Sequence, residues 1–274
     1  MKIKPPASKS GLWKDLTAEE RRERRRLRRE KQREDNLGRA AKMHLARLKT
    51  KKEGRDGLSK LEASVHVGCS GWRYWKWRDS FYAGVPQPDW FEHYLKDFDT
   101  VEINASFYSW PTVASVQAWR RQPGDRNFIY TVKVCEIITH VKRFRGTKTL
   151  VKDFGLIADI LGDRMGCLLF QLPPSYRYTR ARLDAIVGQL DPARRNVVEF
   201  RHASWWNEDV YSAFRKAGII FCSCRAWIYF NNDNDAYAPE NAMVLRRLLA
   251  DFGRGTAKRS AGRRREAGRA SRAV

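Results

Sequence analysis

Charged and amide side chains stand at the ends of several short apolar runs in this chain. Glu102 and Asn104 alternate with apolar residues in one run, and Glu199 and Arg201 do so in another. Because alternate side chains of a strand point to the same face, each of these pairs shares a face. Three further runs end in polar side chains: Lys133, Gln171 and the pair Asn231-Asn232. Polar residues at the ends of parallel strands are typical of an active or binding site.

Two carboxylates and two cations around one cavity can carry out acid–base chemistry, because opposite charges in a low-dielectric pocket move pKa values apart. We therefore predict Glu102, Lys133, Glu199 and Arg201 as catalytic residues. One Glu would be the general base, while Arg201 and Lys133 hold an anionic or hydroxylated substrate; Lys133 could instead form a Schiff base. In the competing interpretation, Glu102 with Lys133 and Glu199 with Arg201 are structural ion pairs that fill the end of the fold.

Aromatic and hydrogen-bonding residues accompany these charges along the chain. The residues predicted to bind substrate are Trp72, Tyr74, Asn104, Tyr108, His140, Gln171, His202, Trp205, Asn231 and Asn232. The aromatic side chains, together with Phe107, would stack on the substrate, and each of the two His residues is either an acid–base group or a hydrogen-bonded structural residue. A metal triad of Glu102, Glu199 and His202 is a weaker alternative, because no H-x-H or H-E-x-x-H spacing supports it. The sequence thus predicts no metal site and indicates no particular cofactor.

Short β-branched or aromatic runs alternate with longer segments of helical spacing from residue 65 onward. The expected strands are 65–70, 100–105, 127–134, 167–172, 196–201, 218–223 and 228–232. The expected helices lie near 88–97, 112–121, 148–161, 179–190 and 206–216. This alternation predicts an α/β fold with parallel strands and helical crossovers.

Six motifs follow one another through this region. They are Gly68-Cys69-Ser70-Gly71-Trp72-Arg73-Tyr74, Val101-Glu102-Ile103-Asn104-Ala105-Ser106-Phe107-Tyr108, Lys133 followed by Ile138-Thr139-His140, Phe170-Gln171-Leu172-Pro173-Pro174, Glu199-Phe200-Arg201-His202-Ala203-Ser204-Trp205 and Tyr229-Phe230-Asn231-Asn232. In their order and spacing the chain resembles the YecE-like family, also called domain of unknown function 72, over roughly residues 65–250. The resemblance implies a TIM-like (β/α) barrel whose strand ends meet at the carboxyl-terminal mouth. It implies no activity.

About one βα unit of the family pattern is missing near residue 226. The family has a further strand and helix before the last motif, whereas only three residues separate Cys224 from Ile228. A parallel crossover needs a dozen or more residues. We therefore expect the runs 218–223 and 228–232 to merge into one bent strand or to abandon parallel pairing, which leaves the barrel incomplete or open. Alternatively, the sequence reflects a deletion in an ancestral full barrel.

The formal net charge of +23 is concentrated at the two ends of the chain. Residues 1–60 hold 21 Lys and Arg against 9 Asp and Glu, and residues 253–274 hold 8 against 1. We predict a basic, partly helical or disordered arm at 1–60, a barrel at 61–252 and a basic disordered tail at 253–274. Thr17 and Glu20 form a capping-box pattern that begins a long charged helix. Arm and tail are either contacts for nucleic acid or another polyanion, or merely solvated extensions.

The cysteines and the hydropathy indicate a cytoplasmic protein. The five cysteines, which lack C-x-x-C spacing, are predicted to be reduced, buried thiols: Cys69, Cys135, Cys167, Cys222 and Cys224. No apolar run is long enough to span a membrane. Two functions fit these observations: binding or conversion of a polar or anionic small molecule at the mouth of the barrel, and non-catalytic association with nucleic acid through the arm and the tail.

Overall fold

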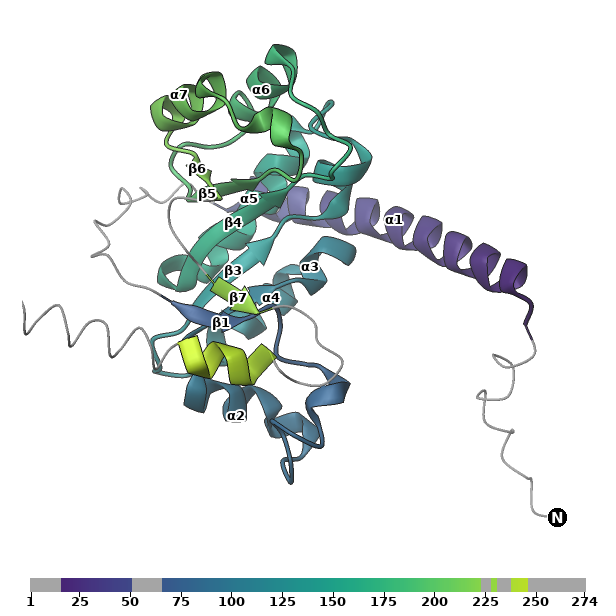
Figure 1. Ribbon diagram of the computed structural model, residues 1–274, viewed down its shortest axis with the longest axis vertical. Helices are drawn as coiled ribbons and strands as arrows, with labels where there is room; N and C mark the ends of the chain where they lie inside the picture. Colours follow the sequence, from purple (N-terminus) through teal and green to yellow (C-terminus); the bar gives the residue numbers. More distant parts are fainter. Residues whose placement is uncertain (1–15, 51–65, 223–227, 231–237, 246–274) are drawn as a thin grey trace, which may run out of the picture.

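Seven parallel strands form one sheet in the described part of the chain (Figure 1). The computed structural model describes residues 16–50, 66–222, 228–230 and 238–245. The strands are β1 (Val67–Cys69), β2 (Thr100–Ile103), β3 (Ile129–Lys133), β4 (Met165–Gln171), β5 (Asn196–Glu199), β6 (Ile220–Phe221) and β7 (Ile228–Phe230). Their order is β6-β5-β4-β3-β2-β1-β7, and every neighbouring pair is parallel. The predicted α/β fold with a parallel sheet is confirmed.

Helices follow the strands as the sequence pattern predicts. They are α1 (Ala18–Lys49), α2 (Trp90–Asp97), α3 (Ala105–Tyr108), α4 (Val113–Arg121), α5 (Lys148–Leu161), α6 (Arg180–Val187) and α7 (Glu208–Ala217), with 3-10 turns at Trp75–Trp77, Gln87–Asp89, Gly162–Arg164 and Ala203–Trp205, a π-helix at Ile137–Val141 and a last helical segment at 238–245. Side-chain caps begin several of them: Thr17, Thr112, Thr179 and Asn207 each accept a hydrogen bond from a backbone N–H of the first turn. The predicted capping box of Thr17 and Glu20 is confirmed.

The last strand corrects one expectation. β7 pairs in parallel with β1, Val67 standing opposite Ile228 and Cys69 opposite Phe230. β6 and β7 are therefore separate strands at opposite ends of the strand order, and neither a merged bent strand nor a loss of parallel pairing occurs. The expectation of a merged strand or of lost parallel pairing was wrong: it rested on the short connection between the two runs, and β7 does not pair with β6. The free edge of β1 accepts it instead.

The two faces of the sheet differ in character. Val101, Val132, Phe170 and Val198 point to the main hydrophobic core, which also contains the inward faces of α2, α4, α5, α6 and α7. By the two-residue alternation of strands, the intervening residues lie on the opposite face. Among the described residues, that face holds a small apolar cluster, in which Cys167, Leu169 and Val197 are buried. Beside this cluster lie the polar side chains that end β2, β3, β4 and β5.

Helix α1 is solvated in its first half and packed in its second half (Figure 1). Asn36, Ala40 and Met43 are buried, and α1 lies against α5. The Asn36 amide donates to the Tyr108 carbonyl at 2.8 Å, and its oxygen accepts from the Trp110 backbone N–H at 2.8 Å. A solvated extension therefore describes only the first half of this helix.

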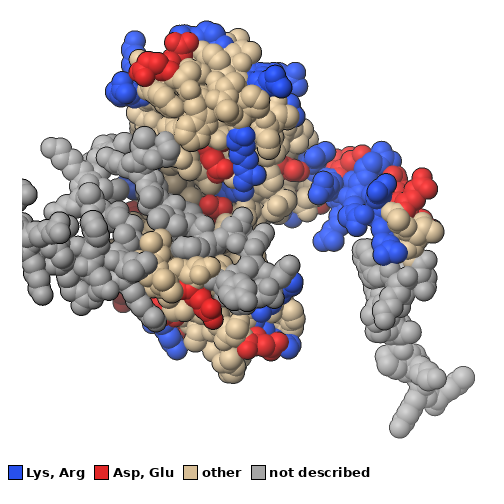
Figure 2. Space-filling view, viewed as in Figure 1, with Lys and Arg blue, Asp and Glu red and all other residues tan. Residues whose placement is uncertain are grey.

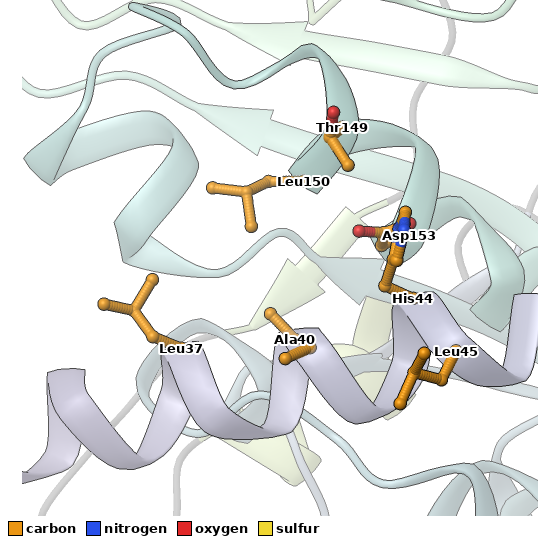
Figure 3. A pocket seen from close by; sticks show the side chains of 8 residues that line it. Leu37, Ala40, His44, Leu45, Thr149, Leu150 and Asp153 are labelled. Atoms are coloured by element: carbon orange, nitrogen blue, oxygen red, sulfur yellow. The ribbon is translucent and has the colours of Figure 1, made fainter.

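Ion pairs hold the second half of α1 as well. The buried Asp153 carboxylate of α5 accepts from Arg47 Nε at 2.7 Å and lies 2.9 Å from His44 Nδ1. Arg33 Nε and Glu136 Oε1 lie 3.2 Å apart. Between α1 and α5 remains an apolar pocket of about 410 Å³ (Figure 3), lined by Leu37, Ala40, Ala41, His44, Leu45, Thr149, Leu150 and Asp153. None of these lining residues is a predicted site residue.

Candidate functional site

Four of the predicted residues lie on one face and at one edge of the sheet. In the parallel register Glu102 stands opposite Thr131, Lys133 opposite Leu169, and Gln171 opposite Glu199. Since Thr131 and Lys133 are two residues apart, they share a face, and so do Leu169 and Gln171. Glu102, Lys133, Gln171 and Glu199 thus follow one another across β2, β3, β4 and β5. We call this set the strand-end cluster.

Glu102 is buried beside a serine that the sequence analysis did not single out. Its side chain is 8% exposed, and Glu102 Oε1 accepts a hydrogen bond from Ser70 Oγ at 2.9 Å. Burial raises the pKa of the Glu102 carboxyl, while the Lys133 ammonium and the hydrogen bond from Ser70 act in the opposite direction. β1 reaches this place because residue 68 is a glycine: a Cβ there would lie 2.2 Å from the Thr100 carbonyl oxygen. The position of Ser70 directly after β1 could have revealed it.

Lys133 is buried without a direct carboxylate partner among the described residues. The residue is 8% exposed, and its Nζ lies 5.0 Å from the centre of the Phe107 ring. Burial lowers the pKa of Lys133, against the raising effect of the Glu102 and Glu199 charges. In the part of the chain that the structure describes, Nζ forms no ion pair with Glu102 or Glu199. This finding argues against the interpretation of Glu102 and Lys133 as a structural ion pair.

Glu199, in contrast, has two close partners. Its Oε2 accepts from Gln171 Nε2 at 2.7 Å, and its Oε1 accepts from Arg201 Nε at 3.1 Å. The pairing of Glu199 with Arg201 therefore exists, but the Arg201 side chain is 48% exposed. Its remaining N–H groups can bind a carboxylate or phosphate group in two-pronged fashion.

His140 lies in the π-helix that follows β3. π-Helical turns are rare and are frequent at functional sites. Its ring meets Phe107 edge to face with centres 4.8 Å apart, and Nδ1 lies 2.9 Å from Thr139 Oγ1. Burial and then the Lys133 charge lower the pKa of His140. Since Lys133 Nζ and His140 both contact Phe107, this ring connects His140 with the cluster, which sequence spacing alone did not show.

The aromatic residues predicted to bind substrate take different positions. Trp205 is fully buried, with its ring stacked 4.0 Å from Phe200, centre to centre. It is a core residue, so its prediction as a stacking surface for substrate finds no support in its position. Trp72 packs edge-on against Phe91, the Tyr74 hydroxyl donates to the Ser70 carbonyl, and burial raises the pKa of Tyr74 to about 12. Tyr108 is 59% exposed.

The remaining predicted site residues also take different positions. His202 Nδ1 accepts from the Ser204 backbone N–H at 3.1 Å and so caps the 3-10 turn Ala203–Trp205, as the structural interpretation expects. Asn104 follows β2, and its buried Oδ1 has no hydrogen-bond partner among the described residues. Asn231 and Asn232 lie outside the described residues. Among those described, no three His, Cys, Asp or Glu side chains are grouped closely enough to hold a metal ion. Glu102, Glu199 and His202 therefore do not form such a group.

Four of the five cysteines lie in the described part of the chain. Cys69, Cys135 and Cys167 are buried as predicted, and burial raises the pKa of Cys135 to about 11 and of Cys167 to about 12. The prediction that Cys222 is buried was wrong: it is exposed, directly after the short strand β6 at the end of the strand order. Cys224 lies outside the described residues. In the described ranges no helix combines the length and the apolar character needed to cross a bilayer.

Comparison with known proteins places this arrangement in a family. The profile described as "Protein of unknown function DUF72" matches residues 66–226, which is more than half of the chain. The chain belongs to the DUF72 family. This DUF72 chain is 29% identical over 112 residues to the UPF0759 protein YecE of Escherichia coli strain K12, and the aligned part covers 41% of this chain and 39% of YecE. It thus spans about two fifths of the length of that relative.

A solved structure agrees with this assignment. The crystal structure of a DUF72 family protein from Thermotoga maritima is similar with a TM-score of 0.50 at 29% identity, over 57% of this chain and 63% of that one. The α/β fold and the family predicted from the motifs are confirmed. The names of these relatives assign no activity.

The raised pKa of Glu102 predicts a pH-dependent loss of stability. The folded state retains a proton that the unfolded chain releases near its ordinary pKa of 4.5. The stabilising contribution is complete below pH 4.5 and is lost as the pH rises through the folded-state pKa. Glu102→Gln imitates the protonated carboxyl, so we expect it to match the parent near pH 4 and to exceed it at pH 7, by on the order of 1 kcal/mol. Urea unfolding from pH 4 to pH 8 measures this difference. A variant less stable than the parent at pH 7 would mean that the Glu102 charge is stabilising.

Proposed function

We propose that this DUF72 protein binds and converts a polar or anionic small molecule at the strand-end cluster. In this proposal Glu102 and Lys133 are the reacting groups, Arg201 holds the anionic part of the ligand, and Gln171, Glu199 and His140 hydrogen-bond to it. One observation carries it: a carboxyl and an amine are buried on neighbouring strands without forming a direct ion pair with each other. A purely structural pair would be expected to close, because burying two uncompensated charged groups is costly.

The sheet itself is part of the proposal. We infer that it is a TIM-like barrel lacking about one βα unit between β6 and β7, in a cytoplasmic protein. The order of the strands supports this inference, since β7 joins β1 while β6 remains at the other end. Because active sites of such barrels lie at the carboxyl ends of the strands, the cluster stands where a ligand is expected. The buried thiols Cys135 and Cys167 suit a reducing compartment.

A thermal-shift screen of polar metabolites tests the small-molecule function. A true ligand should raise the Tm of the parent protein, since binding to the folded state stabilises it. Lys133→Met should abolish this shift, and Lys152→Met, which removes an exposed lysine of α5, should leave it unchanged. An equal shift in the parent and in Lys133→Met would place the ligand elsewhere. The function would be refuted if no compound shifted the Tm of the parent.

A second function, contact with nucleic acid, is favoured by the first half of α1. Figure 2 shows basic side chains gathered on the part of α1 that projects from the body. There Glu23 and Glu30 pair with Arg26, while Arg22, Arg25 and Arg29 are exposed. These three arginines lie on one side of the helix by their spacing of three and four residues. Arginine suits phosphate groups, and the packed second half of α1 would hold the projecting half in place. The basic tail at 253–274, which lies outside the described residues, would add to this binding.

Charge removal tests this second function better than deletion of residues 1–60, because that deletion also removes the buried residues of α1. Replacing Arg22, Arg25 and Arg29 by Gln should weaken binding to a DNA or RNA duplex. If all three contact phosphates, the slope of log K against log salt should fall in magnitude by about 2.7. A control with the same loss of charge replaces the exposed Lys96, Lys152 and Lys216 by Gln. Fluorescence anisotropy at several salt concentrations measures both; equal losses in the two triple variants, or no binding by the parent at low salt, would contradict the idea.

A further inference from the structure

We propose that Lys133 forms an imine with the carbonyl carbon of an aldehyde or ketone that also carries a carboxylate or phosphate group. This inference rests on the proposed small-molecule function and names its reactive atom and its class of substrate. An imine-forming lysine needs an amine that is accessible to the substrate, neutral for part of the time and not bound in an ion pair.

The surroundings of Lys133 meet the last two of these requirements. Nζ is at the end of β3, over the face of Phe107, and among the described residues no carboxylate pairs with it directly. The charged and titratable groups around it are Glu102 on β2, Glu199 on β5, Arg201 after β5 and His140 in the π-helix. Burial and Arg201 favour the neutral amine, whereas the two carboxyl groups favour the ammonium ion. Burial is the largest of these effects.

The reaction needs no oxidant or reductant. The lone pair of Nζ attacks the carbonyl carbon, the C–N bond forms, and the C=O π electrons move to oxygen, which takes up a proton. The nitrogen then loses one proton. The resulting hydroxyl leaves as water after receiving a second proton, and the nitrogen lone pair forms the C=N bond. Glu102 is placed to give a proton to this hydroxyl, because burial keeps its carboxyl protonated to higher pH and its strand neighbours β3. His140, whose pKa is lowered, can accept the proton from nitrogen.

The Arg201 guanidinium is the reason why we expect an anionic carbonyl compound. Arg201 Nε donates a hydrogen bond to Glu199 Oε1, and the Arg201 side chain is 48% exposed. The guanidinium can therefore bind a carboxylate or a phosphate of the substrate while the carbonyl group reaches Lys133. Gln171, held by Glu199 at 2.7 Å, can bind a hydroxyl group between them.

Borohydride trapping tests the imine directly. The full-length protein is incubated with pyruvate, or in a parallel arm with glycolaldehyde phosphate, and then reduced; peptide mass spectrometry locates the secondary amine that forms. Exposed lysines should react first if accessibility alone decided, since Lys133 is only 8% exposed. We expect Lys133 to be labelled at least about tenfold more than the exposed Lys142, Lys152 and Lys216, because an activated lysine reacts at a pH where ordinary amines are protonated. The compound that gives the higher labelling shows whether the anionic group is a carboxylate or a phosphate.

Two variants make the result decisive. Lys133→Arg keeps the positive charge and should lose the label at residue 133 while its melting curve stays close to that of the parent; Lys152→Arg should keep the label at Lys133. Labelling spread over the exposed lysines, with Lys133 not enriched in either arm, would overturn the imine. If the metabolite screen still found a ligand whose binding requires Lys133, the proposed function would survive that result. If both experiments failed, the cluster would have neither role.

Discussion

Trp205→Ala is expected to lower the free energy of unfolding by about 3–5 kcal/mol, the usual cost of truncating a fully buried tryptophan. The Trp205 ring lies 4.0 Å from that of Phe200 and 5.5 Å from that of Tyr176, centre to centre, in two stacked contacts. Its Nε1 also donates to the Tyr176 carbonyl at 2.6 Å. Truncation thus removes these two stacked contacts and an edge-on contact with Tyr178, opens a cavity and leaves a buried carbonyl without its donor.

The neighbouring tryptophan is the matched control. Trp206 is 55% exposed and has one ring contact, with Phe221. Trp206→Ala should therefore cost about 1 kcal/mol or less. Urea unfolding at pH 7 measures both variants. Should Trp205→Ala unfold like the parent but fail to bind the ligand found by thermal shift, the original prediction of Trp205 as a substrate-binding residue would be right after all.

Asn36→Ala is expected to cost about 2–4 kcal/mol, because it leaves a buried and a partly buried backbone group without their Asn36 partner. These are the Trp110 N–H, which now donates to Asn36 Oδ1, and the Tyr108 carbonyl, which now accepts from Asn36 Nδ2. We also expect the Trp110 amide to exchange its hydrogen faster, since the second half of α1 is held to the body partly by this residue.

Asp35→Ala is the control for this prediction. Asp35 precedes Asn36 in the same helix but is exposed, so its replacement should change stability by no more than about 0.5 kcal/mol. Equal stability of the two variants would show that α1 does not depend on Asn36 for its packing. The nucleic-acid proposal would then lose the anchored helix on which it relies.

Local patterns in the sequence were sufficient to predict the strands and the crossover helices. The alternation of apolar and polar residues placed Glu102, Lys133, Gln171 and Glu199 at strand ends, and the parallel register brings them to one edge. The capping box at Thr17 was visible because it depends on residues only three apart. Predictions of this kind need no knowledge of distant contacts.

Contacts between distant segments could not be predicted in this way. The apolar positions of α1 are sparse, so nothing in its pattern indicated that Asn36 would be buried against Trp110, 74 residues away. Trp205 was assigned to the site because it follows Glu199 and Arg201 in a motif, yet its ring turns into the core. The partner of β7 was missed for the same reason, since β7 pairs with β1, the first strand of the sheet in the chain.

We attribute the buried charges of the strand-end cluster to ligand binding, and the stability of Lys133→Met tests this most directly. A functional lysine that lacks a direct ion pair contributes little to folding, so the variant should have a free energy of unfolding equal to or above that of the parent at pH 7. Urea unfolding of the parent, Lys133→Met and the exposed control Lys152→Met gives the answer. A loss of about 3–5 kcal/mol in Lys133→Met alone, as when a buried ion pair is broken, would show that the cluster is a structural plug.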